Sequence, residues 1–534
     1  MPRAYGKTTL MTSKGFEKRF SAIAARDCSI LAGGLKGIEK ESLRIGADGH
    51  LAQSEHPTAL GSALTNRYIT TDYSEALLEF ITPAFSSTWE AQQFLCDVHQ
   101  FTYANLGDEL LWTASMPCRI PADSRIPLAQ YGTSNVGQMK TIYRRGLGHR
   151  YGRQMQTIAG VHFNYSLPKN FWPLYKDVLG SEQSDDDFRS EHYLGLVRNF
   201  RRFGWLVLYL FGSSPAMCKS FAGDTELAMS VLKSETLYEP YGTSLRMSDL
   251  GYSNQNQSKM NISLNSLESY VRDLSAAIET REPEYEAIGV KVDGEYRQLN
   301  ANSLQIENEY YSSVRPKRVA MSGERPTAAL RRGGIEYVEI RSLDINVDDP
   351  AGINQNTMRF VEAFLIYCLL EDSPPLCTES LDETKLNQTM TAKNGRDPEF
   401  RLQRNGKAVA LQTWADEILE NVMGIAECLD RQEDCSGYTD SVRLMQGLVA
   451  DADETPSARV LSKLRDDGLS FFELALSLAE GQRDYFDQIA PLSEDRQQQF
   501  ATEAEESILK QQQIEASDSI SLDEYLATYF SSGT

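Results

Sequence analysis

Gly-Ile-Glu-Lys-Glu-Ser-Leu-Arg-Ile, from Gly37 to Ile45, is the segment around which we interpret the chain. Read as a strand, it places Glu39 and Glu41 on one face. Unpaired carboxylates repel one another and are costly to desolvate, so this face needs either open water or a cation. Most exposed acids are simply solvated, and the downstream sequence must decide between a solvated strand and a site for a hard ion such as Mg²⁺.

Composition indicates a large globular protein without nucleic-acid or anionic-membrane partners. The 534 residues are 41% hydrophobic and 24% charged, and 75 acidic against 53 basic residues give a net charge of -22. Such an acidic excess disfavours binding to polyanions. No apolar run approaches the roughly 18 residues of a membrane helix, and the N-terminus lacks an apolar signal-peptide centre. We therefore expect a cytoplasmic protein.

The cysteines and the N-terminus carry no metal or phosphate motif. The eight cysteines are dispersed without zinc-ligand spacing, so reduced thiols are expected. Gly6-Lys7-Thr8 resembles the end of a phosphate-binding loop, but its first glycine would fall at Met1. If the protein uses ATP, residues outside this motif must bind its phosphates. Phe16, Phe20 and Ile23 fit a short amphipathic helix.

A second acidic cluster lies in Thr70–Pro83. As a strand, this segment places Glu75 and Glu79 on one face; as a helix, it again places them together, with Asp72 beside them. The β-branched flanks and the closing Thr-Pro favour extended structure. In either case the acids need a counter-ion.

Two further segments supply a candidate ligand and a candidate anion site. His162 is one of only six histidines and lies in a stretch where polar and apolar residues alternate. It could be a metal ligand on the face of a sheet or a structural histidine. Met139–Arg153 is a basic helix that meets either an anionic substrate or solvent. Residues 189–211 read as one long, partly buried helix.

The region from Leu304 to Asp344 completes a predicted site. Residues 305–311 are predicted to form a strand. The basic run that follows, 315–318, could bind a triphosphate or could be a surface loop. The clearest strand, 333–344, places Glu339 and Arg341 on one face. This pair could serve a metal and a phosphate, or neutralise each other.

The sequence indicates one active site in the first two thirds of the chain, with helices of the C-terminal part packed against it. Residues 1–350 are the expected catalytic antiparallel-sheet region with the ATP, metal and amino-acid sites. Residues 351–534 are expected to be mainly helical and packed on it, without forming an independent domain. The Gln- and Glu-rich tail from Asp495 to Phe530 reads as solvated helix with little chemistry.

Many segments in register resemble the proteobacterial type of glutamate–cysteine ligase. The similarity runs from about residue 35 to 350 and continues more weakly through 456–459. The segments are Gly37–Arg44, Leu60–Thr65, Ile69–Pro83, Leu128–Asn135, Arg150–Gly152, Gly160–Pro168, Ser244–Tyr252, Leu304–Glu309, Arg315–Arg318 and Gly333–Asn346.

The resemblance implies an α+β fold related to glutamine synthetase and the guanidino kinases, with a curved antiparallel sheet forming a funnel inside surrounding helices. It also implies ATP-dependent joining of the L-glutamate γ-carboxylate to the L-cysteine amine through γ-glutamyl phosphate, the first step of glutathione biosynthesis. We expect a monomer with glutathione as feedback inhibitor. The alternatives are a ligase for another amine and a non-catalytic metal-binding protein with the same fold.

The family's site residues can be carried over position by position. The implied ligands of Mg²⁺ or Mn²⁺ are Glu39, Glu41, Asp72, Glu79, His162 and Glu339. The implied amino-acid site is Tyr143, Arg246, Tyr252 and Tyr311, with Arg246 on the glutamate α-carboxylate and the tyrosines around cysteine. Arg341 and Glu339 are implied as catalytic, and the implied ATP contacts are Arg315, Lys317, Arg318 and Arg341.

Overall fold

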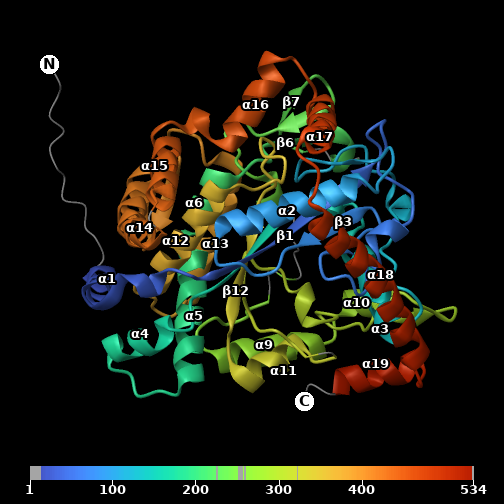
Figure 1. The fold of residues 1–534 in the computed structure, drawn as a ribbon, viewed down its shortest axis with the longest axis horizontal. Helices are drawn as coiled ribbons and strands as arrows, with labels where there is room; N and C mark the ends of the chain where they lie inside the picture. The colour runs from blue at the N-terminus through green and yellow to red at the C-terminus, as the bar shows by residue number, and fades with distance from the viewer. Residues whose placement is uncertain are drawn as a thin grey trace.

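A computed structural model describes residues 14–223, 227–250, 257, 260–321, 323–433 and 435–531. Gly6–Thr8 and Tyr252 lie outside this part of the chain. Among the described residues, the molecule combines one large antiparallel sheet with many helices (Figure 1). No helix found there is long and apolar enough to cross a membrane.

The large sheet is built around β1, Leu35–Ile45. Its seven strands run in the order β11-β12-β5-β1-β3-β2, with β4 also paired to β1. All neighbours are antiparallel. The predicted strands around 37–45, 161–166 and 337–343 are confirmed. The extended segment predicted for Thr70–Pro83 is confirmed only in part, because a turn at 72–76, which contains Glu75, separates a strand at 69–71 from one at 77–81. The other strands are β2 Ile69–Thr71, β3 Leu77–Ile81, β4 Leu110–Leu111, β5 Val161–Ser166, β11 Val314–Lys317 and β12 Tyr337–Leu343.

Strand register gathers the polar residues on one face. Glu39 stands opposite His162 on β5, and Glu41 stands opposite Glu79 on β3. On the next strand, Glu339 stands beside Asn164. Because side chains alternate along a strand, these groups point to the same side while the apolar residues between them point to the other.

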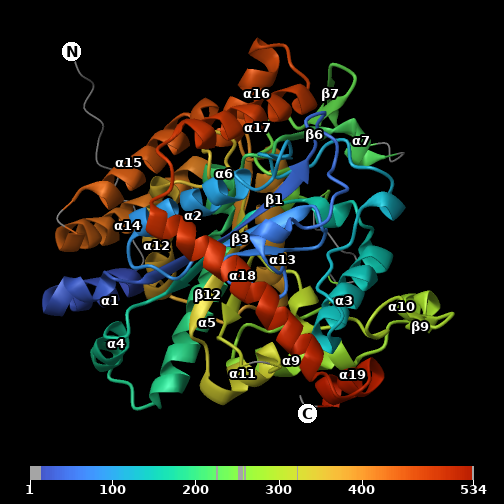
Figure 2. The same cartoon turned by 45° about the vertical axis from the view of Figure 1, so that its right-hand side comes forward.

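The apolar face of the sheet is covered by three helices, α2 Thr88–Tyr103, α5 Asp185–Phe203 and α12 Gln355–Leu370. Figure 2 shows α2 and α12 beside the strands. Ile38 and Phe163 from the sheet are fully buried in the same core as Phe360 and Phe364 of α12. One apolar core therefore joins the sheet to helices from both parts of the chain.

The remaining helices enclose the sheet. The amphipathic helix predicted near residue 16 is confirmed as α1, whereas the single helix predicted for 189–211 is wrong, because Gly204 separates α5 from α6. The other helices are α1 Lys14–Asp27, α3 Asn135–Tyr151, α4 Phe171–Leu179, α6 Trp205–Phe211, α7 Lys219–Ala222, α9 Leu267–Glu279, α10 Pro283–Ile288, α11 Pro326–Gly333, α13 Thr378–Asn394, α14 Leu411–Glu433, α15 Gly437–Ala450, α16 Pro456–Asp466, α17 Phe471–Gln488, α18 Glu494–Ser517 and α19 Leu522–Ser531.

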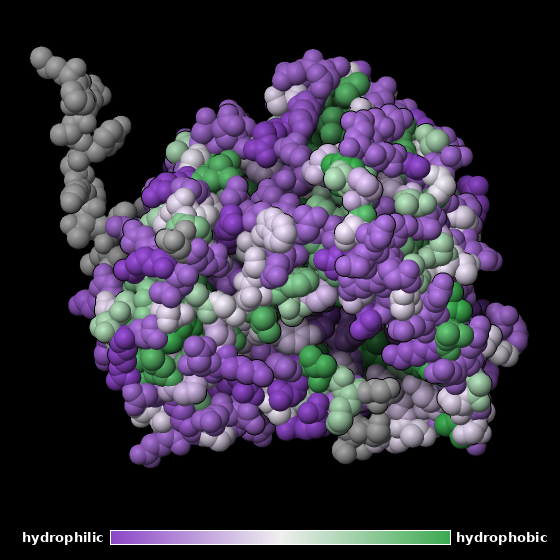
Figure 3. Space-filling model, viewed as in Figure 1, coloured by the Kyte–Doolittle hydropathy of each residue, from purple (hydrophilic) through white to green (hydrophobic). Residues whose placement is uncertain are grey.

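Three small sheets lie apart from the large one. They consist of β6 Ala216–Cys218 with β7 Ser230–Leu232 and β8 Thr236–Tyr238, of β9 Lys291–Val292 with β10 Glu295–Tyr296, and of β13 Arg401–Arg404 with β14 Lys407–Ala410. The side of the molecule seen in Figure 3 is mainly hydrophilic and is hollowed below and to the right of its centre.

The strand predicted for 305–311 is wrong. Glu307–Glu309 forms a turn of 3-10 helix. The Glu307 carboxylate accepts a hydrogen bond from Arg325 Nε at 3.0 Å, and Glu309 accepts one from Arg150 Nη1 at 2.9 Å. Both acids are buried, and each binds an arginine from a different element. In a regular strand, residues 307 and 309 would point to the same face of the sheet.

The tail is not merely a solvated helix. Phe500 of α18 and Leu526 of α19 are buried, and the Glu503 carboxylate accepts hydrogen bonds from the Arg67 backbone at 2.9 Å and from Arg67 Nε at 2.7 Å. Figures 1 and 2 both show α18 running across the molecule to α19, which lies by α3.

The expectation of separate reduced thiols is wrong for four of the cysteines. Cys28 pairs with Cys428 and Cys118 with Cys218, over sequence separations of 400 and 100 residues. Tertiary packing brings these partners together, so their spacing in the sequence carried no signal. Cys96, Cys368, Cys377 and Cys435 are free thiols.

Candidate active site

A cluster of acids surrounds His162 on the polar face of the sheet. Ligand atoms of Glu39, Glu79 and His162 all lie within 4.8 Å of one another. His162 Nδ1 is 3.2 Å from Glu39 Oε2 and 3.7 Å from Glu339 Oε1, and His162 Nε2 is 3.6 Å from Glu41 Oε1. Residues far apart in the sequence thus meet because β1, β3, β5 and β12 are neighbours.

The electrostatics of the cluster fit a bound cation. Burial, followed by the negative charges of Glu39 and Asp72, raises the pKa of Glu79 well above its usual value. Burial also raises the pKa of Glu41. Convergent carboxylates with a histidine are oxygen-rich donors of the kind that Mg²⁺ and Mn²⁺ prefer, and a divalent ion would remove their mutual repulsion.

Glu339 is the acid in closest contact with the basic side chains. Arg341 Nη1 is 2.7 Å from Glu339 Oε1, and Lys317 Nζ is 3.3 Å from Glu339 Oε2. Burial raises the pKa of Glu339, but the positive charges of Lys317, Arg341 and Arg315 outweigh it and hold this pKa well below its usual range. The carboxylate is therefore ionised, and both of its oxygens already face cationic side chains.

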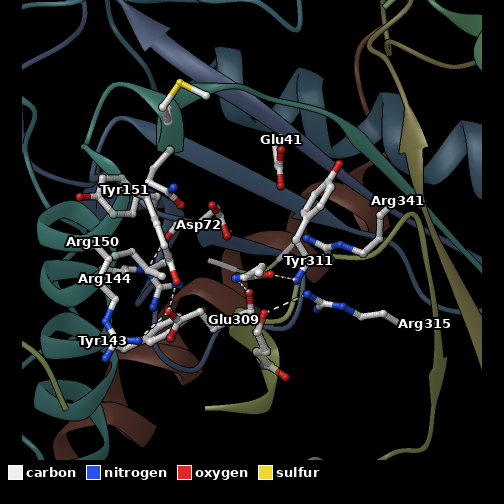
Figure 4. Close-up of a pocket in the computed structure, with 16 residues that line it drawn as sticks. Glu41, Asp72, Tyr143, Arg144, Arg150, Tyr151, Glu309, Tyr311, Arg315 and Arg341 are labelled. Atoms are coloured by element: carbon white, nitrogen blue, oxygen red, sulfur yellow. Dashed lines mark hydrogen bonds and ion pairs between the residues drawn. The ribbon is translucent and has the colours of Figure 1, made fainter. Parts of the chain in front are cut away.

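A cavity of about 370 Å³ adjoins this cluster (Figure 4). One wall comes from α3, and the opposite wall carries Tyr311, Arg315 and Arg341, with Glu41 above them in the view. The lining residues are Glu41, Asp72, Tyr73, Tyr143, Arg144, Leu147, Arg150, Tyr151, Met155, Gln156, Gln257, Asn308, Glu309, Tyr311, Arg315 and Arg341. Glu41 and Asp72 thus face both the acid cluster and the cavity.

The predicted amino-acid residues divide between the cavity and the interior. Tyr143 and Tyr311 line the cavity. Arg246 is only 2% exposed; it lies 3.8 Å from Asp344 and donates a hydrogen bond to the Arg341 carbonyl at 2.8 Å. It is absent from the cavity lining, although it contacts the strand that carries Arg341. Tyr252 is outside the described residues.

The predicted ATP-binding residues are distributed among the cavity, the acid cluster and a second cavity. Arg315 lines the cavity and donates to the Asn308 carbonyl at 2.9 Å. Lys317 lies at the acid cluster. Arg318 lies farther along, 3.9 Å from Glu336, and lines a separate cavity of about 550 Å³.

Sequence reasoning missed several cavity residues on or beside α3. Glu309 accepts hydrogen bonds from Arg150 Nη1 at 2.9 Å and from the Tyr151 hydroxyl at 2.5 Å. Arg144 is the other missed cation. The basic run at 139–153 was the available signal, but helical spacing alone could not distinguish a solvated face from a cavity wall. Glu75 is not a site residue, because its carboxylate accepts from the backbone of His56 and Gln130.

Comparison with known proteins shows the family of this chain. The family model described as glutamate–cysteine ligase matches residues 21–391. The chain belongs to the glutamate–cysteine ligase family. Glutamate–cysteine ligases of Alcanivorax borkumensis and Pseudomonas putida are 49% and 45% identical to it; each alignment spans 97% of this chain and, respectively, 99% and 98% of the relative.

Two solved structures share the fold of this chain. The crystal structure of the Francisella tularensis glutamate–cysteine ligase in complex with AMP is 36% identical, with a TM-score of 0.88, and the match covers 94% of this chain and 98% of that one. A bifunctional glutathione synthetase from Pasteurella multocida shares the fold at 24% identity and a TM-score of 0.72, over 88% of this chain and 55% of that one.

Proposed function

We propose that this protein joins the γ-carboxylate of L-glutamate to the amine of L-cysteine with ATP, the first step of glutathione biosynthesis. The observation that carries the proposal is the acid cluster around His162, which adjoins a cavity walled by arginines and tyrosines. Family membership supports the same reaction.

The acid cluster is the proposed metal site. Glu39, Glu41, Asp72, Glu79, His162 and Glu339 would hold Mg²⁺ or Mn²⁺. A bound ion of this kind would supply positive charge that neutralises the phosphates of ATP. Support comes from the convergence of the donor atoms and from the raised pKa of Glu79, which a cation would relieve.

The basic residues of β11 and β12 are the proposed contacts of ATP. Arg341 is the catalytic arginine, because it lies at the junction of the acid cluster and the cavity, and Glu339 positions it through their 2.7 Å ion pair. Lys317 and Arg315 add positive charge nearby, whereas Arg318 is farther away and would contact the distal part of the nucleotide. These cations oppose the negative charge that builds up during phosphoryl transfer.

The reaction has two steps. A γ-carboxylate oxygen of glutamate attacks the γ-phosphorus of ATP, and the bond to ADP breaks, giving γ-glutamyl phosphate. The cysteine nitrogen then attacks the acyl carbon, phosphate leaves with the electrons of the C–O bond, and the amine loses a proton. Activation is needed because a carboxylate oxygen is a poor leaving group. Tyr143, Tyr311 and Tyr252 would shape the cysteine site and exclude water from the acyl phosphate.

Arg246 remains our proposal for the glutamate α-carboxylate, supported by its contact with the Arg341 strand. Binding would require Arg246 to exchange part of its interaction with Asp344 for the substrate, since it is buried here. We further propose the funnel-shaped sheet of the glutamine synthetase type, a cytoplasmic monomer and inhibition by glutathione; these rest on the family resemblance.

The deciding experiment measures ADP release with MgCl₂, glutamate and cysteine, omitting each in turn, for the wild type and for Glu39→Gln and Glu339→Gln. We expect rapid release only with every component and a large loss in both variants. Exposed Glu295→Gln is the control. Equal rates with unrelated amines would contradict cysteine as the substrate, and no ADP under any condition would overturn the ligase proposal.

A further inference from the structure

A further cavity, remote from the candidate active site, lies between α13 and α14. Its volume is about 220 Å³, far larger than the roughly 30 Å³ that one water molecule occupies in the liquid. We call it the α13–α14 cavity; Thr384 of α13 and Trp414 and Asn421 of α14 line it. Among the described residues, it shares no lining side chain with the cavity beside the acid cluster. Figure 1 shows α12 and α14 at the left of the view and α3, a wall of that other cavity, at the right.

Two nearly buried polar side chains face the α13–α14 cavity without a partner. Thr384 is 4% exposed, Asn421 is 8% exposed, and both line the cavity. Neither the Thr384 hydroxyl nor the Asn421 amide makes a hydrogen bond to any described residue. Buried polar groups in folded proteins nearly always have a hydrogen-bond partner, because leaving one without it costs free energy. The partner of these two groups is therefore a molecule held in the cavity.

A carboxylate without an ion-pair partner also lines the cavity. Glu371, just after the end of α12, is largely buried. Its carboxylate accepts hydrogen bonds from the Asp372 backbone at 2.7 Å and from the Tyr367 hydroxyl at 3.2 Å. These contacts orient Glu371, but among the described residues no basic side chain neutralises it.

Arg202 of α5 is a guanidinium in the same situation. It donates to Asn199 Oδ1 at 3.0 Å and to the Pro374 carbonyl, and no described carboxylate pairs with it. Burial and the positive charge of Arg198 lower the pKa of Arg202 to about 10. Asn199 Nδ2 also donates to the Glu371 carbonyl at 3.1 Å, so the two uncompensated charges belong to adjoining segments.

The remaining charged side chains around the α13–α14 cavity are already engaged. Arg404 pairs with Glu417, and Asp372 pairs with an arginine of α1 at 2.6 Å. Glu383 accepts hydrogen bonds from the backbone N–H groups of residues 405–406 at 3.1 and 2.8 Å. A ligand that enters the cavity therefore meets Glu371 and Arg202 as unpaired charges of opposite sign.

An apolar wall stands beside these polar groups. Phe203, at the end of α5, has its ring centre 5.7 Å from that of Tyr367 and 6.2 Å from that of Trp414. All three rings line the cavity, as does Ile418. Pockets for small organic ligands typically combine an apolar surface with a few polar groups that fix orientation.

We propose that the α13–α14 cavity binds a free α-amino acid with an apolar side chain. Such a molecule carries an ammonium and a carboxylate on one carbon, so it pairs with Glu371 and Arg202 at once. Thr384 and Asn421 supply further hydrogen bonds, and the aromatic wall covers the side chain. An amine without a carboxylate would leave Arg202 unpaired, and a carboxylic acid without an ammonium would leave Glu371 unpaired. The site is separate from the proposed reaction and does not depend on it.

The first test is isothermal titration calorimetry of the wild-type protein without ATP, using L-leucine, 3-methylbutylamine and 4-methylpentanoate. The last two compounds carry the same branched side chain with only the ammonium or only the carboxylate. We expect L-leucine to bind about 10- to 100-fold more tightly than either, because each analogue loses one charge-assisted contact. Bound L-leucine should also raise the Tm by mass action. Equal affinity for all three compounds, or neither heat nor a Tm shift with about 10 mM L-leucine, would overturn the proposal.

Variants of the cavity then locate the site. Thr384→Val and Asn421→Leu should each weaken L-leucine binding about 2- to 10-fold, since each removes a neutral hydrogen bond. Arg202→Met and Glu371→Gln should each weaken it about 10- to 100-fold, since each removes a charge. Exposed positions of α13 and α14 outside the cavity lining supply the matched controls, which should leave the Kd unchanged: Thr413→Val, Lys385→Met and Glu420→Gln.

An unchanged Kd in all four cavity variants would place the bound amino acid elsewhere, the candidate active site included, and would contradict the assignment. If the charge variants do not fold, Thr384→Val decides, because valine has nearly the shape of threonine and lacks only the hydroxyl. A Kd for Thr384→Val equal to that of Thr413→Val would then count against the site.

Discussion

The side chains of Glu339 and Arg341 form an ion pair at the edge of the acid cluster. They pair at 2.7 Å, while the second Glu339 oxygen faces Lys317 at 3.3 Å and His162 is 3.7 Å from the first. The pair is therefore neutralised and also positioned at the edge of the acid cluster. Such preorganised charges lose little energy to reorientation when new charge develops.

Lys40 gives a prediction about pH. It lies between the acids on β1 but points to the opposite side, where its Nζ is 3.0 Å from His99 Nε2. Burial lowers its pKa from 10.5 to about 7. Above pH 7 the folded protein releases this proton while the unfolded chain keeps it up to about pH 10, so the free energy of unfolding should rise with pH by about 1.4 kcal/mol per unit from this group.

Lys40→Met removes that contribution. Its stability relative to the wild type should be most favourable below pH 7 and should decline toward pH 10, as measured by urea unfolding at several pH values. Lys36→Met is the contrasting variant, since Lys36 pairs with buried Glu362 at 2.7 Å and its loss leaves a buried carboxylate, which costs about 3–5 kcal/mol. A pH-independent difference for Lys40→Met would contradict the prediction.

Helix α19 packs against α3, which forms one wall of the cavity. Leu526 lies in one apolar cluster with Met139 and Ile142 of α3 and with Leu299, and Tyr143 lies at the edge of that cluster. Helix α3 therefore depends on α19 for part of its packing.

We predict that Leu526→Asp lowers kcat/KM for cysteine by about 10- to 100-fold, because a buried charge detaches α19 and lets α3 shift. Steady-state kinetics check this, with far-UV circular dichroism to show that the remaining helices are retained. Ile520→Asp, at a position that is 46% exposed, is the matched control. Unchanged kinetics for Leu526→Asp would show that α3 holds its position alone.

Elements with a strong period were predictable from the sequence, and those fixed by tertiary contacts were not. The alternation around Glu39, His162 and Glu339 identified three sheet strands and the face that holds the acids. The Glu307–Glu309 turn was not predicted, because its acids bind Arg325 and Arg150, which lie 18 and 159 residues away in the sequence. The position of α3 at the cavity was not predicted either, because a basic helix face has the same sequence pattern whether it lies against solvent or lines a cavity.

The sheet and the C-terminal helices share one apolar core, which predicts cooperative unfolding. Phe360 and Phe364 are fully buried against the same cluster as Ile38 and Phe163. We expect residues 1–350 expressed alone to be insoluble or unfolded, because their sheet loses its cover and exposes a large apolar surface. Solubility and hydrogen exchange of the fragment and of the intact protein check this. A soluble fragment with native-like protection of β1 would contradict it.

The contacts that α18 and α19 make with residues 60–67 and with α3 have a consequence for biosynthesis. Residues 60–67 and α3 emerge from the ribosome well before their partners Glu503, Ser507 and Leu526 are translated. Until then the α3 wall of the cavity lacks this packing, so the nascent chain should not acquire activity before α19 has been made. A message cut short before the codons for α18 would then yield a chain that holds every strand of the large sheet but has a poorly formed cavity.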